Sequence, residues 1–164
     1  VEYNYTRVQE LLSQSLSEHP DIIVLPETWN TGFYPSKELI NIADRNGERT
    51  QSLLRTFAKE HNVNIVGGSV AVAKNDVVFN TSYAYNREGT LVGEYSKMHG
   101  FSPAKEDQYF AGGTHTTHFE LDGIPCSTVI CYDIRFPELV RMAALPNTEL
   151  LFVPAQWPTM RLRH

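Results

Sequence analysis

Three polar residues of different chemistry each follow an apolar, strand-like segment. They are Glu27 after residues 22–25, Lys97 after residues 90–95 and Cys131 after residues 124–130. Because α/β proteins place catalytic groups where strand ends meet loops, these side chains could project into one cleft. A thiol can attack a carbonyl once it is deprotonated, a carboxylate can take its proton, and an ammonium can hold the developing oxyanion. The three residue types therefore form a workable set for acyl transfer.

Each of the three residues also has an ordinary structural explanation. A glutamate after a proline is usually a solvated loop residue, and a lysine at a strand end usually points into solvent. A cysteine between Ile130 and Tyr132 is usually a small buried hydrophobic residue. Spacing along the chain does not decide between these explanations.

The hydrophobic periodicity predicts three helices and seven strands around the candidate residues. Helices are predicted over residues 5–17, 49–60 and 136–145. Strands are predicted over residues 22–25, 63–72, 77–85, 90–95, 116–121, 124–130 and 149–153. Helices and strands intermixed in this way indicate a single layered α/β domain with a mixed sheet.

Local patterns add detail to three of these elements. Thr6 and Gln9 have the spacing of a capping box at the start of the first helix, although Asn4 could cap it equally well. The continuous apolar run at 22–25 predicts a strand buried on both faces. Gly67-Gly68 lies inside a predicted strand, where glycine weakens pairing unless another backbone or a ligand approaches closely.

Two further patterns predict hairpins. Asn86-Arg87-Glu88-Gly89 joins the strands at 77–85 and 90–95, and Asp122-Gly123 joins the strands at 116–121 and 124–130. Each turn brings consecutive strands side by side. The second half of the chain is therefore expected to be rich in antiparallel pairs.

Three segments around the candidates resemble the signature blocks of a known family. They are Leu25-Pro26-Glu27-Thr28-Trp29, Tyr95-Ser96-Lys97-Met98-His99 and Val129-Ile130-Cys131-Tyr132-Asp133-Ile134-Arg135-Phe136-Pro137-Glu138-Leu139. In this order they resemble the nitrilase superfamily, the carbon–nitrogen hydrolases. The resemblance covers nearly the whole chain. It implies one carbon–nitrogen hydrolase domain over residues 1–164, folded as a nitrilase-like four-layer α-β-β-α sandwich with mixed sheets, incomplete at both ends.

The resemblance implies a role for each candidate. Glu27 would be the general base, Lys97 the lysine that stabilises the oxyanion and Cys131 the nucleophile. Many members carry a second glutamate shortly after the lysine, and Glu106 fits that place best. The residue after the nucleophile, Tyr132, would donate its backbone N–H to the oxyanion. The implied reaction is hydrolysis of a non-peptide C–N bond in a small linear amide through a thioester, with no metal and no cofactor.

The segment at 154–158 resembles the pocket-lining segment of omega-amidase-like members. It makes Gln156 and Trp157 the expected substrate-binding residues and a monoamide of a short dicarboxylic acid, such as 2-oxoglutaramate, the expected substrate. Two alternatives remain open. One is another activity of the superfamily on N-carbamoyl compounds, aliphatic amides or nitriles. The other is a non-catalytic member that binds a partner, which the intact set of candidate residues argues against.

Several polar residues beside the candidates are expected to have supporting roles. Asp133 and Arg135 are expected to tie the loop after Cys131 to the following helix, and His99 to support the loop after Lys97. Asn80-Thr81-Ser82 matches the sequon for N-glycosylation, which means little without a signal peptide.

The two cysteines are expected to differ in function. Cys126 and Cys131 form neither a disulfide framework nor a CxxC motif, which favours a reducing cytoplasm. Their odd separation places them on opposite faces of a regular strand. The helix that opens at Phe136-Pro137 and the nearby Lys97 are expected to favour a thiolate at Cys131, whereas Glu27 is expected to oppose it unless it takes the thiol proton as a base. Cys131, and not Cys126, is therefore the expected nucleophile.

The composition argues against several kinds of partner. The chain has 14 Lys and Arg against 19 Asp and Glu, a net charge of −5. This balance is not typical of proteins that bind nucleic acid or an anionic membrane. No apolar run approaches the ~20 residues of a membrane span. His115 and His118 fall on opposite faces of a predicted strand and are poor partners for one metal ion.

Two features of the family have no counterpart in this sequence. Members begin with a strand ahead of the helix predicted at Tyr5, and they continue well past the position of His164. We therefore expect the native polypeptide to extend beyond Val1 and beyond His164. The family also implies a homodimer or higher homo-oligomer that assembles through helices near the nucleophile.

Overall fold

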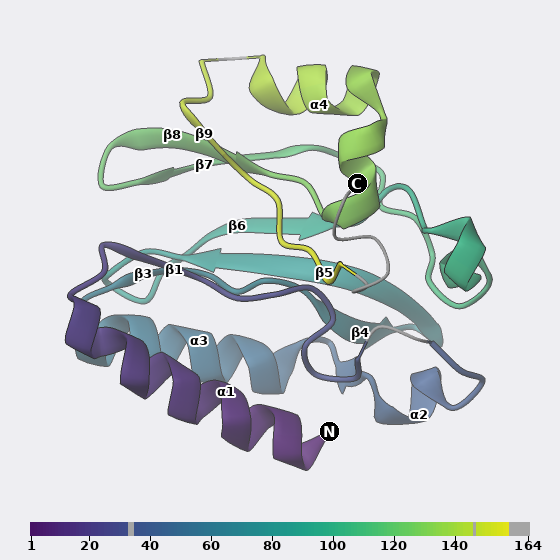
Figure 1. The fold of residues 1–164 in the computed structure, drawn as a ribbon, viewed down its shortest axis with the longest axis horizontal. Helices are drawn as coiled ribbons and strands as arrows, with labels where there is room; N and C mark the ends of the chain where they lie inside the picture. Colours follow the sequence, from purple (N-terminus) through teal and green to yellow (C-terminus); the bar gives the residue numbers. More distant parts are fainter. Residues whose placement is uncertain (33–34, 146, 158–164) are drawn as a thin grey trace.

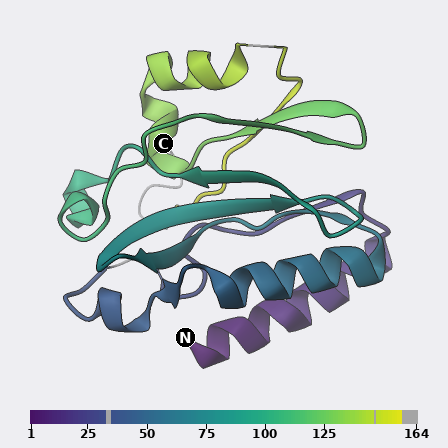
Figure 2. The same cartoon turned by 180° about the vertical axis from the view of Figure 1, so that it is seen from behind.

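The chain forms four layers in the order helix, sheet, sheet, helix (Figure 1). The computed structural model describes residues 1–32, 35–145 and 147–157. Helices α1 (Glu2–Ser15) and α3 (Glu48–His61) lie side by side on the outer face of the larger sheet in both views (Figures 1 and 2). The smaller sheet packs on its inner face, and helix α4 (Pro137–Ala144) covers the smaller sheet. The predicted α-β-β-α sandwich is confirmed.

Both sheets are mixed. The strands are β1 (Ile22–Val24), β2 (Asp44–Arg45), β3 (Asn64–Val66), β4 (Val70–Lys74), β5 (Val77–Tyr85), β6 (Leu91–Ser96), β7 (Thr117–Leu121), β8 (Ile124–Thr128) and β9 (Leu150–Phe152). The larger sheet has the order β1-β3-β5-β4-β2, with β6 also paired to β5, and the smaller has the order β7-β8-β9. Three pairs are parallel: β1 with β3, β2 with β4 and β8 with β9. Both predicted hairpins, β5–β6 and β7–β8, are present and antiparallel.

The three predicted helices are present, but the first begins earlier than its capping pattern indicated. Helix α1 starts at Glu2, so Thr6 and Gln9 lie inside it and no side chain caps it. The reason is tertiary: Tyr5 is buried, and its hydroxyl lies 2.8 Å from Thr50 Oγ1 of α3. That contact holds the first turn of α1 against α3. The short helix α2 (Leu39–Ile42) and strand β2 were not predicted, because such short elements show no periodicity.

Strand β1 is not buried on both faces as its apolar run predicted. Ile23 is 8% exposed, whereas Val24 is 47% exposed. The reason is position in the sheet: β1 is the edge strand and pairs only with β3 among the described strands. In this sheet, the continuous apolar run at 22–25 therefore forms an edge strand that is partly exposed.

The predicted strand at 63–72 is two strands separated by a bulge at residues 67–69. Strands β3 and β4 both pair with β5, and the register shifts between Val66↔Ala84 and Val70↔Thr81. Gly68 has a φ of +63°, and a Cβ there would collide with the carbonyl oxygen of Pro26. The predicted close approach of another backbone is confirmed. That backbone carries Glu27.

Apolar side chains fill each of the three spaces between the layers. Between the helices and the larger sheet lie Leu12, Leu54, Ala58, Ile65 and Val72, among others. Between the sheets lie Val66, Ala84, Phe119, Leu121 and Cys126. Under α4 lie Val129, Leu139 and Ala143. No helix in the described part of the chain has the length and apolar character needed to cross a membrane.

Arg87 ties the two sheets together at the β5–β6 turn. Its guanidinium donates to both carboxylate oxygens of Asp122 in the β7–β8 turn, at 2.7 and 2.6 Å. It also donates to Asp21 ahead of β1 at 2.9 Å and to the Asn62 carbonyl ahead of β3 at 2.9 Å. One side chain thus connects segments of both sheets.

Candidate active site

Glu27 lies in the loop after β1, and this loop is fixed to the bulge between β3 and β4. The Thr28 N–H donates to Ser69 Oγ at 3.0 Å, and the Trp29 indole N–H donates to the Gly67 carbonyl at 2.9 Å. Thr28 has a φ of +43°, which is unfavourable for a residue other than glycine and is held here by these contacts. The Glu27 side chain is only 2% exposed.

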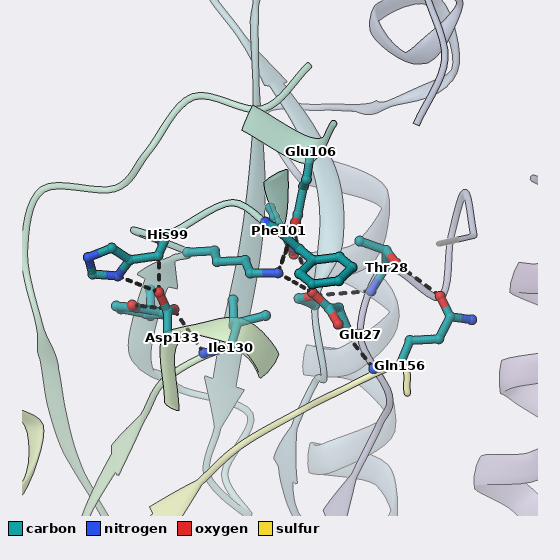
Figure 3. Close-up of polar contacts among 12 residues, drawn as sticks. Glu27, Thr28, His99, Phe101, Glu106, Ile130, Asp133 and Gln156 are labelled. Atoms are coloured by element: carbon teal, nitrogen blue, oxygen red, sulfur yellow. Dashed lines mark hydrogen bonds and ion pairs between the residues drawn. The ribbon is translucent and has the colours of Figure 1, made fainter. Parts of the chain in front are cut away.

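Lys97 lies directly after β6, and its ammonium sits between two carboxylates. Nζ is 2.7 Å from Glu27 Oε1 and 2.7 Å from Glu106 Oε2. Glu106 opens the 3-10 turn Glu106–Gln108, and its Oε2 also accepts the Phe101 N–H at 2.7 Å. Figure 3 shows the two glutamates pointing toward each other. The structure thus brings together three of the predicted residues.

The two carboxylates keep Lys97 charged. Burial disfavours the charged form of Lys97, but the charges of Glu27 and Glu106 and their hydrogen bonds outweigh burial and raise the pKa of the ammonium. Lys97 is therefore a cation at neutral pH. An ammonium fixed at this position can stabilise a negative charge that develops on a bound carbonyl oxygen.

Cys131 begins the 3-10 turn Cys131–Arg135, which lies between β8 and α4. Its φ is +46°, and its backbone N–H donates to the Pro154 carbonyl at 2.9 Å. The thiol lies beside the Glu27 carboxylate and interacts with it. The side chain is 6% exposed. All four residues predicted to be catalytic therefore meet in one buried cluster.

The Cys131 thiol is protonated at neutral pH. Burial, the charge of Glu27 and the hydrogen bond to Glu27 raise the pKa of the Cys131 thiol to about 12, and Lys97 offsets only part of this. Lys97 and Glu27 act on the pKa of the thiol in the expected opposite directions, but burial and Glu27 together outweigh Lys97, so the net balance favours the thiol and not the thiolate. The Lys97 charge is shared with two carboxylates, and α4 begins beyond Cys131, with Phe136 at its N-cap.

One family accounts for the whole chain. The carbon-nitrogen hydrolase family matches residues 1–163. The chain belongs to the carbon-nitrogen hydrolase family. This match confirms the resemblance carried by the segments around Glu27, Lys97 and Cys131.

Relatives within the family include amidases. The chain is 45% identical over 155 residues to the 2-oxoglutaramate amidase of Bacillus subtilis, covering 94% of this chain and 60% of that protein. It is 33% identical to the omega-amidase NIT2 of Danio rerio, and the match covers 92% of this chain and 57% of that protein. A carbon-nitrogen hydrolase superfamily protein of Xanthomonas campestris, solved with an arsenic adduct in its active site, superposes with a TM-score of 0.82 at 30% identity, covering 98% and 61%. The chain spans about 60% of the length of these relatives.

The segment at 154–157 of this carbon-nitrogen hydrolase lies against the cluster. The Gln156 N–H donates to Glu27 Oε2 at 3.0 Å, and the Gln156 side chain accepts from the Thr28 hydroxyl at 3.3 Å. Trp157 packs beside Cys131, together with Tyr95 and Ile130. Gln156 therefore holds the candidate base by its backbone, a contact that sequence reasoning did not foresee. Pro158 lies outside the described residues.

Tyr132, the predicted second oxyanion donor, follows Cys131 in the 3-10 turn. Its ring contacts Phe101 and Phe136 edge to face, with centroids 5.1 and 5.6 Å apart. These contacts fix the residue whose backbone N–H was predicted to face the substrate. They also connect the turn to the loop between Lys97 and Glu106.

Asp133 fixes the Cys131 turn to the Lys97 loop. It is fully buried, and its carboxylate accepts from the Tyr95 hydroxyl at 2.7 Å, the His99 N–H at 2.9 Å and the Ile130 N–H at 3.1 Å (Figure 3). The side chain thus ties the turn to β6 and the loop after it, while the Asp133 carbonyl makes the expected tie to the following helix by accepting the N–H of its N-cap residue, Phe136, at 3.0 Å. His99 supports this loop as expected, because its ring stacks on the ring of Phe136 with the two ring centroids 3.6 Å apart.

Asn80 is a member of the cluster that sequence reasoning missed. It lies in β5, is 1% exposed, and its side-chain Nδ2 donates to both Glu27 and Glu106. Its burial also excludes glycan attachment in the folded protein, although it begins a sequon. The only sequence signal was a polar residue within an apolar strand.

Two other predictions concern residues outside the cluster. Cys126 lies in β8, and its side chain packs between the two sheets, away from the cluster. The prediction that Cys126 and Cys131 lie on opposite faces of one strand does not apply, because β8 ends at Thr128, before Cys131. Across the described ranges, no group of three His, Cys, Asp or Glu side chains is arranged to hold a metal ion.

Proposed function

We propose that Glu27, Lys97, Glu106 and Cys131 form the catalytic site of a cysteine-dependent amidase. The observation that carries the proposal is the buried contact of a thiol with a carboxylate that is itself paired with an ammonium. These are the nucleophile, base and oxyanion partner that acyl transfer requires. The identity with amidases of the family supports the same conclusion.

The proposed reaction has two half-reactions. Cys131 Sγ attacks the amide carbonyl carbon while its proton passes to Glu27, and Lys97 Nζ and the Tyr132 N–H stabilise the tetrahedral oxygen. The C–N bond then breaks, Glu27 returns the proton to the departing nitrogen, and ammonia leaves a thioester on Cys131. A water molecule gives a proton to Glu27, attacks the thioester, releases the carboxylic acid and restores the thiol.

Because the resting thiol is protonated, the timing of its proton transfer to Glu27 relative to attack on the carbonyl is constrained. Because the pKa of the Cys131 thiol is raised to about 12, deprotonation before attack is unfavourable. Transfer to Glu27 therefore accompanies bond formation in the proposed mechanism. Glu106 has no contact with the thiol among the described interactions; its role is to hold Lys97.

We further propose a small ω-monoamide of a dicarboxylic acid as the substrate class, with 2-oxoglutaramate as the first candidate. Support comes from the 2-oxoglutaramate amidase relative and from Gln156 and Trp157 beside the cluster. The cluster itself has one ammonium and two carboxylates, so a substrate carboxylate needs a further cation. The Arg135 guanidinium, 5.7 Å from the centre of the Trp157 ring, could provide it.

Another activity of the same family is the main alternative. A nitrilase of Pyrococcus abyssi is 30% identical to this chain, and N-carbamoyl or nitrile hydrolysis would use the same nucleophile with a different pocket. A non-catalytic, partner-binding role is less favoured, because it would not require a thiol in contact with a buried carboxylate.

The complete polypeptide should be tested with a substrate panel and ammonia detection. We expect 2-oxoglutaramate and other ω-monoamides of dicarboxylic acids to be turned over much faster than neutral amides, N-carbamoyl compounds or nitriles. Comparable rates on neutral and anionic amides would refute the substrate class. Turnover of nitriles alone would favour the alternative.

The matched cysteine variants test the nucleophile in the same assay. Cys131→Ala should lose about 10⁴-fold or more in kcat, as expected when a covalent nucleophile is removed. Cys126→Ala removes the other buried thiol and should retain near-normal kcat with a modest loss of stability. Near-normal turnover by Cys131→Ala would exclude the proposed mechanism.

We also propose a cytoplasmic protein that acts as a homodimer or higher homo-oligomer, with a small amide as its partner and neither nucleic acid nor membrane. Both cysteines are free, which fits a reducing compartment. The outer side of α4 and the preceding turn exposes Ile134, Met142 and Leu145. These apolar side chains support assembly through the helix next to Cys131.

A further inference from the structure

Asn80 connects the two carboxylates of the site through a single nitrogen. Its Nδ2 donates to Glu27 Oε1 at 3.1 Å and to Glu106 Oε1 at 3.0 Å. The same two oxygens lie 2.7 and 3.0 Å from Lys97 Nζ. Asn80 Nδ2 and Lys97 Nζ therefore hold the two Oε1 atoms from two directions.

The oxygen of the Asn80 side-chain amide accepts no hydrogen bond from the described residues. Asn80 Oδ1 is buried and has no hydrogen-bond partner within the described ranges, whereas buried polar atoms are normally satisfied. The buried amides of Asn30 and Asn64 show the normal pattern, because their Oδ1 atoms accept from the Ala71 N–H at 2.9 Å and the Arg87 N–H at 3.2 Å. At Asn80, the amide nitrogen contacts both carboxylates, while the amide oxygen is left without a partner among the described residues.

This arrangement distinguishes the two oxygens of Glu27. Oε1 accepts from both Lys97 and Asn80, whereas the backbone and side-chain N–H donors in the described part of the chain give Oε2 one hydrogen bond, from the Gln156 N–H at 3.0 Å. Oε2 therefore keeps more capacity to accept a further proton, since a carboxylate oxygen has two lone-pair sites. The Cys131 thiol lies beside this same carboxylate, which raises the pKa of the thiol.

We propose that Asn80 is a positioning residue that fixes Glu27 against Glu106 and Lys97, so that the remaining oxygen of Glu27 faces the Cys131 thiol. The inference rests on the proposed function, because it assigns Asn80 a role in proton transfer from Cys131 to Glu27. Asn80 acts through the two glutamates. It also offsets the repulsion between two carboxylates that share one ammonium, because donors to a carboxylate favour its charged form.

Asn80→Asp and Asn80→Ala in the complete polypeptide test the proposal. Both remove the shared donor, and the aspartate keeps the shape while adding a third carboxylate. We expect kcat to fall ten- to a hundredfold with KM within about threefold, as for loss of a charge-assisted hydrogen bond that acts in the chemical step. We expect the acidic limb of the pH profile to move up by about one pH unit in Asn80→Ala and further in Asn80→Asp.

Asn64→Ala is the matched control. Asn64 is also fully buried, and its Nδ2 donates twice, to the Asp21 carbonyl and to Asp122 Oδ2. It lies at the far end of the sheet, beside Arg87. This variant should lower the melting temperature while leaving the acidic limb and KM unchanged. A purely structural role for Asn80 predicts the same result for the Asn80 variants.

Alkylation of Cys131 by iodoacetamide gives a second readout that needs no turnover. Its rate should show the same upward shift of the acidic limb in the Asn80 variants and no shift in Asn64→Ala. If the wild-type protein hydrolyses no amide, the proposed function fails while alkylation still tests Asn80. Unchanged acidic limbs in both Asn80 variants would overturn the inference, and so would failure of both variants to fold, because Asn80 would then be structural.

Discussion

Cys131 shows how burial and charge compete at a single atom. Burial and Glu27 raise the pKa of its thiol from 9.0 to about 12, although Lys97 lies in the same cluster. This rise in the pKa of the thiol corresponds to about 4 kcal/mol of added cost for forming the thiolate. A lone thiolate would be available to any electrophile, whereas in the proposed mechanism the thiol becomes nucleophilic only when Glu27 accepts its proton. The arrangement thus favours reaction with a bound substrate.

The same shift predicts how folding stability depends on pH. The unfolded chain loses the Cys131 proton near pH 9.0, but the folded chain keeps it to about 12. The contribution of Cys131 is therefore fully present below pH 9 and is lost as pH rises toward 12. We expect the free energy of unfolding of the wild type to fall faster above pH 9 than that of Cys131→Ser, by at most about 1.4 kcal/mol per pH unit.

Urea unfolding of both proteins from pH 7 to 10.5 measures this difference. Groups that titrate in both proteins, such as the tyrosines, cancel in the comparison. Parallel curves over the whole range would show that the Cys131 thiol is not protected from ionisation.

Among the elements, the bulge between β3 and β4 does most to position the base. It gives the Glu27 loop a partner in Ser69, whose N–H donates to the Pro26 carbonyl at 3.0 Å. The bulge needs glycine at position 68 for two reasons, a φ of +63° and the close Pro26 backbone. The predicted strand at 63–72 is therefore interrupted where the site requires it.

Gly68→Ala tests this positioning. An added Cβ would collide with the Pro26 backbone, so we expect a loss of about 3 kcal/mol in the free energy of unfolding and a drop in kcat of at least tenfold as Glu27 moves. Gly123→Ala is the matched control, because Gly123 has a φ of +79° with nothing within 4 Å of an added Cβ. It should cost about 1 kcal/mol and leave kcat unchanged. Equal effects of the two variants would contradict the role of the bulge.

At the scale of the whole molecule, the site depends on how the two sheets are held together. Glu27 and Lys97 follow strands of the larger sheet, whereas Cys131 follows a strand of the smaller one. Asp133 connects the sheets at the site, and Arg87 connects them at the other end of β5 and β6. The relative position of the sheets therefore sets the distance between the thiol and its base.

Arg87→Ala should weaken the connection remote from the site. We expect a loss of about 1–2 kcal/mol in the free energy of unfolding, because several hydrogen bonds and ion pairs of a partly exposed side chain are lost together. KM should not change. Arg7→Ala removes an exposed ion pair to Glu10 within α1 and should cost less than about 0.5 kcal/mol. Equal unfolding curves for the two variants would show that Arg87 does not hold the sheets.

Much of the architecture could be predicted from the sequence, because its signals are local. Helices α1, α3 and α4 follow from apolar spacing, the two hairpins from their turn residues, and the family from short segments around Glu27, Lys97 and Cys131. The proximity of Glu106 to Lys97 came from the family resemblance, since nine irregular residues give no geometry of their own.

Other properties were decided only by tertiary structure, because they arise between residues far apart in the chain. Asn80 meets Glu27 across 53 positions, and the Gln156 N–H meets Glu27 across 129. The exposure of Val24 depends on which strands flank β1. The protonation of Cys131 depends on summed burial and charge at one point in space, so the opposing effects of Lys97 and Glu27 could be named from the sequence but their sum with burial could not. The sequence determined which residues are the candidates for the chemistry, and the packing of the two sheets decided their distances and charge states.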